Sequence, residues 1–129
     1  MLIRPFYFLF MAVCCVCSVY AENVTHHPQE FLASIQGKPD EGAQIVQHFC
    51  ANCHAVKPLI NLGAPRIGQK ADWLNRVNQG LTILFKHTAE GYNAMPPRGG
   101  CFECSDEQLK KAIQVMLPAM KSPGSKDNK

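Results

Sequence analysis

The stretch "HFCANCHAV", residues 48–56, contains a Cys-x-x-Cys pair that runs directly into a histidine. Residues three and four apart share one face of a helix, so Cys50, Cys53 and His54 can point to the same side. Two thiols there can each form a thioether to a porphyrin edge, while the imidazole turns a nitrogen to the iron. The pattern is the attachment signature of c-type haem. It predicts one covalently attached haem c per chain, with His54 as an iron ligand.

Around this motif the sequence predicts four short helices and no strand. The first starts at a cap, Asp40, and carries the motif at its C-terminal end. Two more cover 72–79 and 82–90, each followed by a glycine. The last begins with a capping box at Ser105 and has an apolar stripe of Leu109, Ala112, Ile113, Met116 and Leu117. Such helices have little protein to pack around, so we expect an all-α fold wrapped around the haem.

The sixth position of the iron needs a second ligand, and Met95 is the best candidate. It lies in the sequence Ala-Met-Pro-Pro, where two prolines stiffen the backbone. A neutral, soft sulfur stabilises ferrous iron, raises the reduction potential and leaves no open site for a substrate. The other candidates are His48, which fits a surface residue, His87, which is the serious alternative, Met116 and Met120.

A second Cys-x-x-Cys pair, Cys101 and Cys104, leaves two other interpretations open. Both pairs together would make a zinc site, but the loop between them is far longer than the ~15 to 20 residues usual for four-cysteine sites. A thiol oxidoreductase needs such a pair at the start of a helix in a βαβ context, and only the second pair meets even the first half of that requirement.

The first twenty-one residues predict export. A single positive charge, Arg4, precedes an apolar run, and Val19 and Ala21 supply the small residues that signal peptidase reads. We expect cleavage after Ala21 and a periplasmic protein. An uncleaved anchor is the alternative, and it alone would give membrane contact, as a tether to the inner membrane. A lipoprotein ranks last. Cleavage removes Cys14, Cys15 and Cys17, and the remaining cysteines of an exported chain should be paired or occupied.

The stretches "NAMPPRGGCFECSDEQL" and "GAPRIG", together with C-x-x-C-H, carry a resemblance to a known family. The chain resembles class I c-type cytochromes, and more narrowly the bacterial cytochrome c5 group, whose members carry A-M-P-P-[KR]-G-G-C-x-x-C-S-D before a final helix. The resemblance covers roughly residues 42–117. It implies a small class I cytochrome c fold and single-electron transport between respiratory redox partners, without enzymatic activity.

The resemblance also implies the roles of three residues. Cys101 and Cys104 would form a disulfide and bind no metal, and the Pro65 carbonyl would accept a hydrogen bond from His54. Partners would be proteins: membrane cytochrome complexes, terminal oxidases or reductases. No small-molecule substrate is expected, and the net charge of +3 argues against bulk nucleic-acid binding. The alternative function is a haem-based sensor or peroxidase-like enzyme with a displaceable methionine.

The expected organisation follows. Residues 1–21 are a signal peptide, 22–41 an N-terminal extension or linker, 42–118 the cytochrome c domain, and 119–129 a disordered tail. Several further side chains have two interpretations each. Trp73 fits either a donor to a haem propionate or a core residue. Arg66 fits either a donor to a propionate or a solvated residue. The cations Lys57, Lys70, Lys86 and Arg98 would either ring an exposed haem edge for docking or form a solvated surface.

Overall fold

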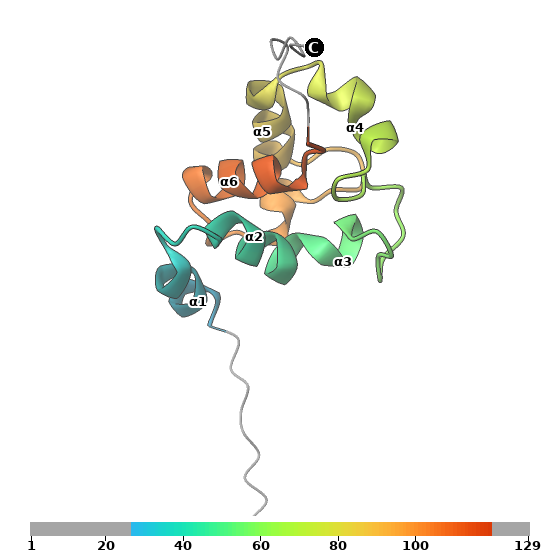
Figure 1. The fold of residues 1–129 in the computed structure, drawn as a ribbon. Coiled ribbons are helices and arrows are strands. Elements are labelled where there is room, and N and C mark those ends of the chain that lie inside the picture. The colour runs from blue at the N-terminus through green and yellow to red at the C-terminus, as the bar shows by residue number, and fades with distance from the viewer. Residues whose placement is uncertain (1–26, 120–129) are drawn as a thin grey trace, which may run out of the picture.

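The computed structural model describes residues 27–119, so the predicted signal peptide and all but the first residue of the predicted tail lie outside the described residues, as does Met120. The helices are α1 (Pro28–Ile35), α2 (Glu41–Ile45), η1 (Val46–Cys50, a π-helix), α3 (Ala51–His54), α4 (Lys70–Val77), α5 (Leu81–Glu90), η2 (Pro97–Gly100, a 3₁₀-helix) and α6 (Asp106–Met116) (Figure 1). Between residues 27 and 119 the only β-type pairing is a single bridge from Tyr92 to Met95. The all-α prediction is confirmed. No helix in this range is long and apolar enough to cross a membrane.

The helix that carries the attachment motif is continuous but changes its winding. The sequence predicted one helix from a cap at Asp40, and the structure has α2, η1 and α3 in succession. The Asp40 side chain makes no cap hydrogen bond. A π turn holds one more residue than an α turn, so η1 rotates the side chains that follow it relative to α2. The orientation of Cys53 and His54 therefore does not follow from the buried face of α2.

Helix α1 lies within the segment predicted as an extension or linker. Pro28 occupies its first turn, where the missing N–H costs nothing. Leu32 and Ile35 are buried in the same core as α2 and α6, and the ring of Phe31 stacks on His48 at 4.3 Å between centroids. Part of the predicted extension therefore packs onto the domain. His48 is exposed, as the sequence indicated.

The core lies where α6 packs against α2 (Figure 1). The predicted capping box is present, since the Gln108 amide donates to Ser105 Oγ and the Ser105 amide donates to Gln108 Oε1. Four residues of the predicted stripe are buried, and Leu117 is partly buried against them. The two helices approach closely at Gly42, where a Cβ would lie 2.8 Å from the Lys111 carbonyl oxygen.

A buried carboxylate, Glu41, joins three elements at this contact. It is 2% exposed. Its oxygens accept hydrogen bonds from Gln108 Nε2 at 3.0 Å and Lys111 Nζ at 2.6 Å, both on α6, and from the Gly37 amide at 3.0 Å. The hydrogen bond from Lys111 is the main cause that holds the pKa of Glu41 below its ordinary value of 4.5, against the opposing effect of burial. Glu41 thus ties the turn after α1 and the start of α2 to α6.

We expect the free energy of unfolding to fall in acid because of this carboxylate. Its folded-state pKa is below the unfolded one, so its contribution is complete above pH 4.5 and is lost as the pH falls through the folded-state value. Glu41→Gln should lose about 2 kcal/mol at neutral pH and flatten this acid limb in denaturant titrations. The matched control is Glu107→Gln, whose solvent-exposed pair with Lys110 should contribute much less to stability. Equal losses in both variants would contradict the assignment.

Candidate haem-binding site

The attachment motif presents two free thiols and one imidazole. Cys50 ends η1, and Cys53 and His54 belong to α3. Neither cysteine of this pair is bonded to another, and both are half-buried. Burial, with a smaller effect of the neighbouring Cys53, raises the pKa of Cys50 to about 11. Cys50 is therefore a neutral thiol at neutral pH. Because both thiols are free, the motif can bind a group through two sulfurs and one ring nitrogen.

His54 is fixed in orientation by the loop that follows the motif. Its Nδ1 lies 2.7 Å from the Pro65 carbonyl oxygen, which is the contact implied by the resemblance. A carbonyl only accepts hydrogen bonds, so Nδ1 carries the proton and donates. In the tautomer with the proton on Nδ1, the lone pair is on Nε2, the nitrogen available to a metal. The Ile67 amide also donates to the His54 carbonyl at 2.7 Å, which ties the loop to α3.

Met95 lies in a tight turn between α5 and η2. Its amide donates to the Tyr92 carbonyl at 2.9 Å, and the Tyr92 amide donates to the Met95 carbonyl at 3.0 Å. Gly91 makes this turn possible, because it has a φ of +87° and a Cβ there would lie 2.9 Å from the Met95 carbonyl oxygen. Residues 91–96, which carry the predicted ligand Met95, are called the ligand loop below. Since η2 packs against both α5 and η1, this loop lies next to the helix that ends in Cys50.

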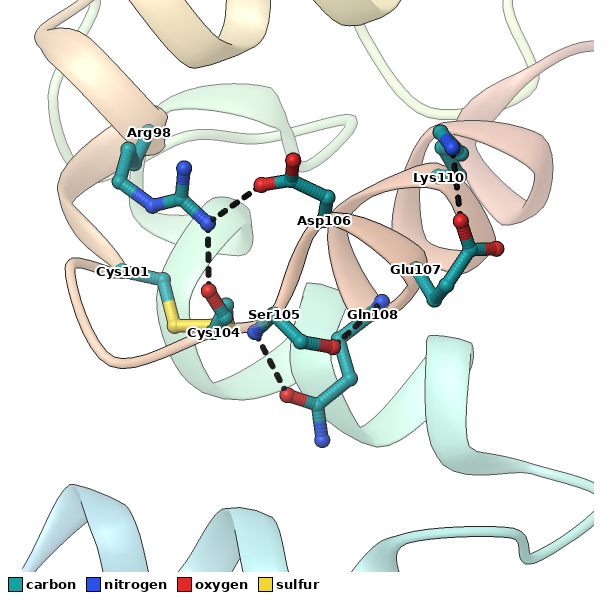
Figure 2. A network of polar contacts seen from close by, with 8 residues as sticks. All are labelled: Arg98, Cys101, Cys104, Ser105, Asp106, Glu107, Gln108 and Lys110. Carbon is teal, nitrogen blue, oxygen red and sulfur yellow. Dashed lines mark hydrogen bonds and ion pairs between the residues drawn. A yellow bond between two sulfur atoms is a disulfide. The ribbon is translucent and has the colours of Figure 1, made fainter.

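The second cysteine pair forms a disulfide. Cys101 and Cys104 are bonded, with 5.4 Å between their Cα atoms, in the turn that leads into α6 (Figure 2). Because these sulfurs are bonded to each other, they cannot share a zinc ion with Cys50 and Cys53. The disulfide turn follows η2 and precedes the capping box of α6.

We expect the double variant Cys101→Ser/Cys104→Ser to keep covalent haem and lose stability. A loop this short gives less chain-entropy stabilisation than the ~3 kcal/mol of a fifteen-residue loop, so the loss should stay below that value. Unfolding titrations of the holoprotein and a test of haem extraction by acidified solvent measure both effects. Loss of attached haem would mean that the two cysteine pairs have been assigned to the wrong roles.

Several other candidate residues have interaction partners within the fold. The Trp73 indole donates to the Arg66 carbonyl at 2.9 Å and is 4% exposed, so it is a core residue. The Arg66 guanidinium pairs with Asp72 at 2.7 Å and holds the pKa of that carboxyl at about 2. His87 stacks on the Tyr92 ring at 4.2 Å. Of the four cations considered for docking, Lys57, Lys70 and Lys86 are exposed, whereas Arg98 is half-buried.

A cavity of about 450 Å³ lies between the loop after the motif and α4. Pro65, Arg66, Asp72 and Arg76 are among its lining residues, which include neither His54 nor Met95. Arg66 Nε and Nη2 donate to the Asp72 carboxylate, and Arg76 Nη1 donates to the Asp72 carbonyl. This cavity is therefore not the space between the two expected iron ligands.

Comparison with known proteins gives consistent matches. The family model described as "Cytochrome C oxidase, cbb3-type, subunit III" matches residues 37–115, a segment that spans the attachment motif, the ligand loop and most of α6 but not α1. Cytochrome c5 of Ectopseudomonas mendocina is 40% identical over 86 residues, which make up 65% of this chain and 95% of the relative.

Two solved structures resemble the fold. A mono-heme ferrocytochrome c from Shewanella putrefaciens has a TM-score of 0.52 and 39% identity, with 58% of this chain and 89% of that chain covered. A chain from the electron transfer complex of nitrite reductase with cytochrome c has a TM-score of 0.52 and 33% identity, with 59% of this chain and 89% of that chain covered.

Proposed function

Because the chain belongs to the class I c-type cytochromes and lies close to the cytochrome c5 group, we propose that it carries single electrons between respiratory redox partners in the periplasm. Its relatives are small monohaem electron carriers and not enzymes, and membership of this family gives it one covalently bound haem c. The haem supplies a one-electron iron couple. The fold supplies the attachment, the axial ligands and the surface that meets a partner.

Within this proposal Cys50 and Cys53 attach the haem, and His54 and Met95 ligate its iron. The observation that carries the assignment is the 2.7 Å contact from His54 Nδ1 to the Pro65 carbonyl, beside two unpaired thiols. That contact fixes both the tautomer and the plane of the ring, so Nε2 needs no reorientation to bind iron. Met95 is supported by its place in a turn that its own backbone hydrogen bonds hold.

With both axial positions filled by the protein, the site has no room for a substrate at the iron. Compared with a second imidazole, a neutral thioether favours the ferrous state, so the reduction potential should be high for a haem protein. Ligands held by a rigid fold also move little when the iron changes oxidation state. These properties suit a carrier that gives up and takes up one electron without other chemistry.

The proposed location and partners rest on the sequence and on a relative. The signal peptide predicted at 1–21 supports export to the periplasm, with a retained tether as the alternative. A solved relative forms an electron transfer complex with nitrite reductase, which supports protein redox partners such as reductases, terminal oxidases or membrane cytochrome complexes here. The loop after the attachment motif exposes apolar side chains suited to a partner contact: Val56, Leu59, Ile60 and Leu62.

Carbon monoxide binding distinguishes the carrier from the sensor or peroxidase-like alternative. We expect the native reduced protein to take up carbon monoxide slowly or not at all, because Met95 occupies the sixth position. Rapid uptake without denaturant would show a displaceable ligand and would favour the alternative. Replacing Met95 with alanine opens the position and gives the positive control for the same measurement.

A further inference from the structure

Arg98 is held in an unusual backbone conformation directly after the ligand loop. It lies in η2, three residues after Met95, with a φ of +58° that non-glycine residues rarely adopt. Such a conformation is strained and persists only where the surroundings impose it. The contacts of its side chain should therefore explain why an arginine stands there.

Its guanidinium bridges the ligand loop to the disulfide turn and to α6. Arg98 Nη2 donates to the Cys104 carbonyl at 2.5 Å and to Asp106 Oδ1 at 3.1 Å (Figure 2). The Arg98 side chain is 25% exposed and the Asp106 side chain is 61% exposed, whereas Cys104 is buried. The charge-assisted hydrogen bond to Cys104 is therefore the one that is shielded from water. Arg98 thus makes a second link, beside the chain itself, from the loop to the Cys101–Cys104 turn.

The backbone turn around Arg98 also touches the thioether. A Cβ on the next residue, Gly99, would lie 3.2 Å from Met95 Cε, so the methyl group of Met95 packs against this backbone. A shift of the turn would therefore move the Met95 side chain. Arg98 Nε is buried and has no hydrogen-bond partner among the described residues, although such groups are normally paired. That donor is free for a group that binds at the loop.

We propose that Arg98 is a positioning residue for Met95: its guanidinium fixes the 96–100 turn to Cys104 and Asp106, and this keeps the thioether on oxidised iron. The proposal rests on the function proposed above, in which Met95 is a haem ligand. The oxidised state is the sensitive one, because a soft thioether binds ferric iron less strongly than ferrous iron.

Exogenous imidazole tests this inference, because it must displace Met95 to bind ferric haem. In Arg98→Gln, loss of charge-assisted hydrogen bonds should make imidazole bind about tenfold more tightly and weaken the far-red sulfur-to-iron band. Arg98→Lys keeps the charge but not the planar fork of donors, so it should behave like Arg98→Gln. Wild-type imidazole affinity and band in both variants would overturn the proposal.

Two neighbouring carboxylates give a matched pair of variants that disturb the fold little. Asp106 pairs with Arg98, whereas Glu107 pairs with Lys110, and both lie in the first turn of α6 (Figure 2). Asp106→Asn should tighten imidazole binding about twofold or more, and Glu107→Gln should leave it unchanged. Equal affinities in these two variants would overturn the proposal even if Arg98→Gln fails to fold. A wild-type protein without the far-red band would instead refute Met95 ligation itself.

Discussion

Met95→His is expected to keep its covalent haem and to lower the reduction potential by roughly 0.2 V, a sizeable part of the ~0.8 V over which axial ligands set haem potentials. A thioether favours ferrous iron, and an imidazole is a harder, more basic donor that favours ferric iron. The two cysteine thioethers and His54 are untouched, so attachment should be normal. A redox titration of the visible spectrum measures the change.

The matched control for this variant is His87→Gln. His87 is the other serious candidate for the sixth position, and in the structure its ring stacks on Tyr92. We expect His87→Gln to keep both the far-red band and the wild-type potential. An unchanged potential in Met95→His, or a lost band in His87→Gln, would contradict the ligand assignment.

Gly42→Ala is expected to destabilise the fold strongly, although it adds only one methyl group. Its Cβ would lie 2.8 Å from the Lys111 carbonyl oxygen and 2.9 Å from the carbonyl carbon, so α2 and α6 would have to separate. Overpacking against backbone should cost about 3 kcal/mol of unfolding free energy. Helix propensity acts in the opposite direction, because alanine is favoured over glycine by ~0.5 to 1 kcal/mol.

Ala43→Gly provides the control, because Ala43 is the next residue on α2 and is exposed. That change should cost only the propensity difference of ~0.5 to 1 kcal/mol. Denaturant titrations of both holoproteins give the comparison. A Gly42→Ala protein as stable as wild type would show that the two helices do not meet as closely as described.

Signals confined to a few neighbouring residues predicted the fold well. The box between Ser105 and Gln108 and the apolar stripe after it are complete within one helix, and both appear in the structure. The helix that carries Cys53 and His54 was also predicted from helical spacing, which is a local pattern, although the predicted cap at Asp40 makes no cap hydrogen bond. Its π turn was not predicted, since one extra residue per turn leaves no clear mark in a short apolar pattern.

Features that depend on distant partners escaped prediction. Glu41 and Lys111 are 70 residues apart in the sequence, so nothing local shows that this carboxylate is buried and paired. Arg98 was interpreted either as a docking cation or as a solvated residue, and its contacts with Cys104 and Asp106, six and eight residues further along the chain, were not predicted. The core contacts of α1 were missed because two buried residues in a polar segment resemble a linker. Cys50, Cys53 and His54 could be proposed from the sequence because haem attachment fixes their spacing, and their roles stay a prediction.

The visible absorption spectrum of the reduced and oxidised protein, produced with the haem-attachment machinery and followed by extraction with acidified solvent, tests the central claim most directly. A carrier with Cys50 and Cys53 thioethers and His54 and Met95 ligands predicts haem that resists extraction, a sharp reduced α band and a far-red band when oxidised. Extractable haem, or a colourless protein despite working machinery, would contradict it.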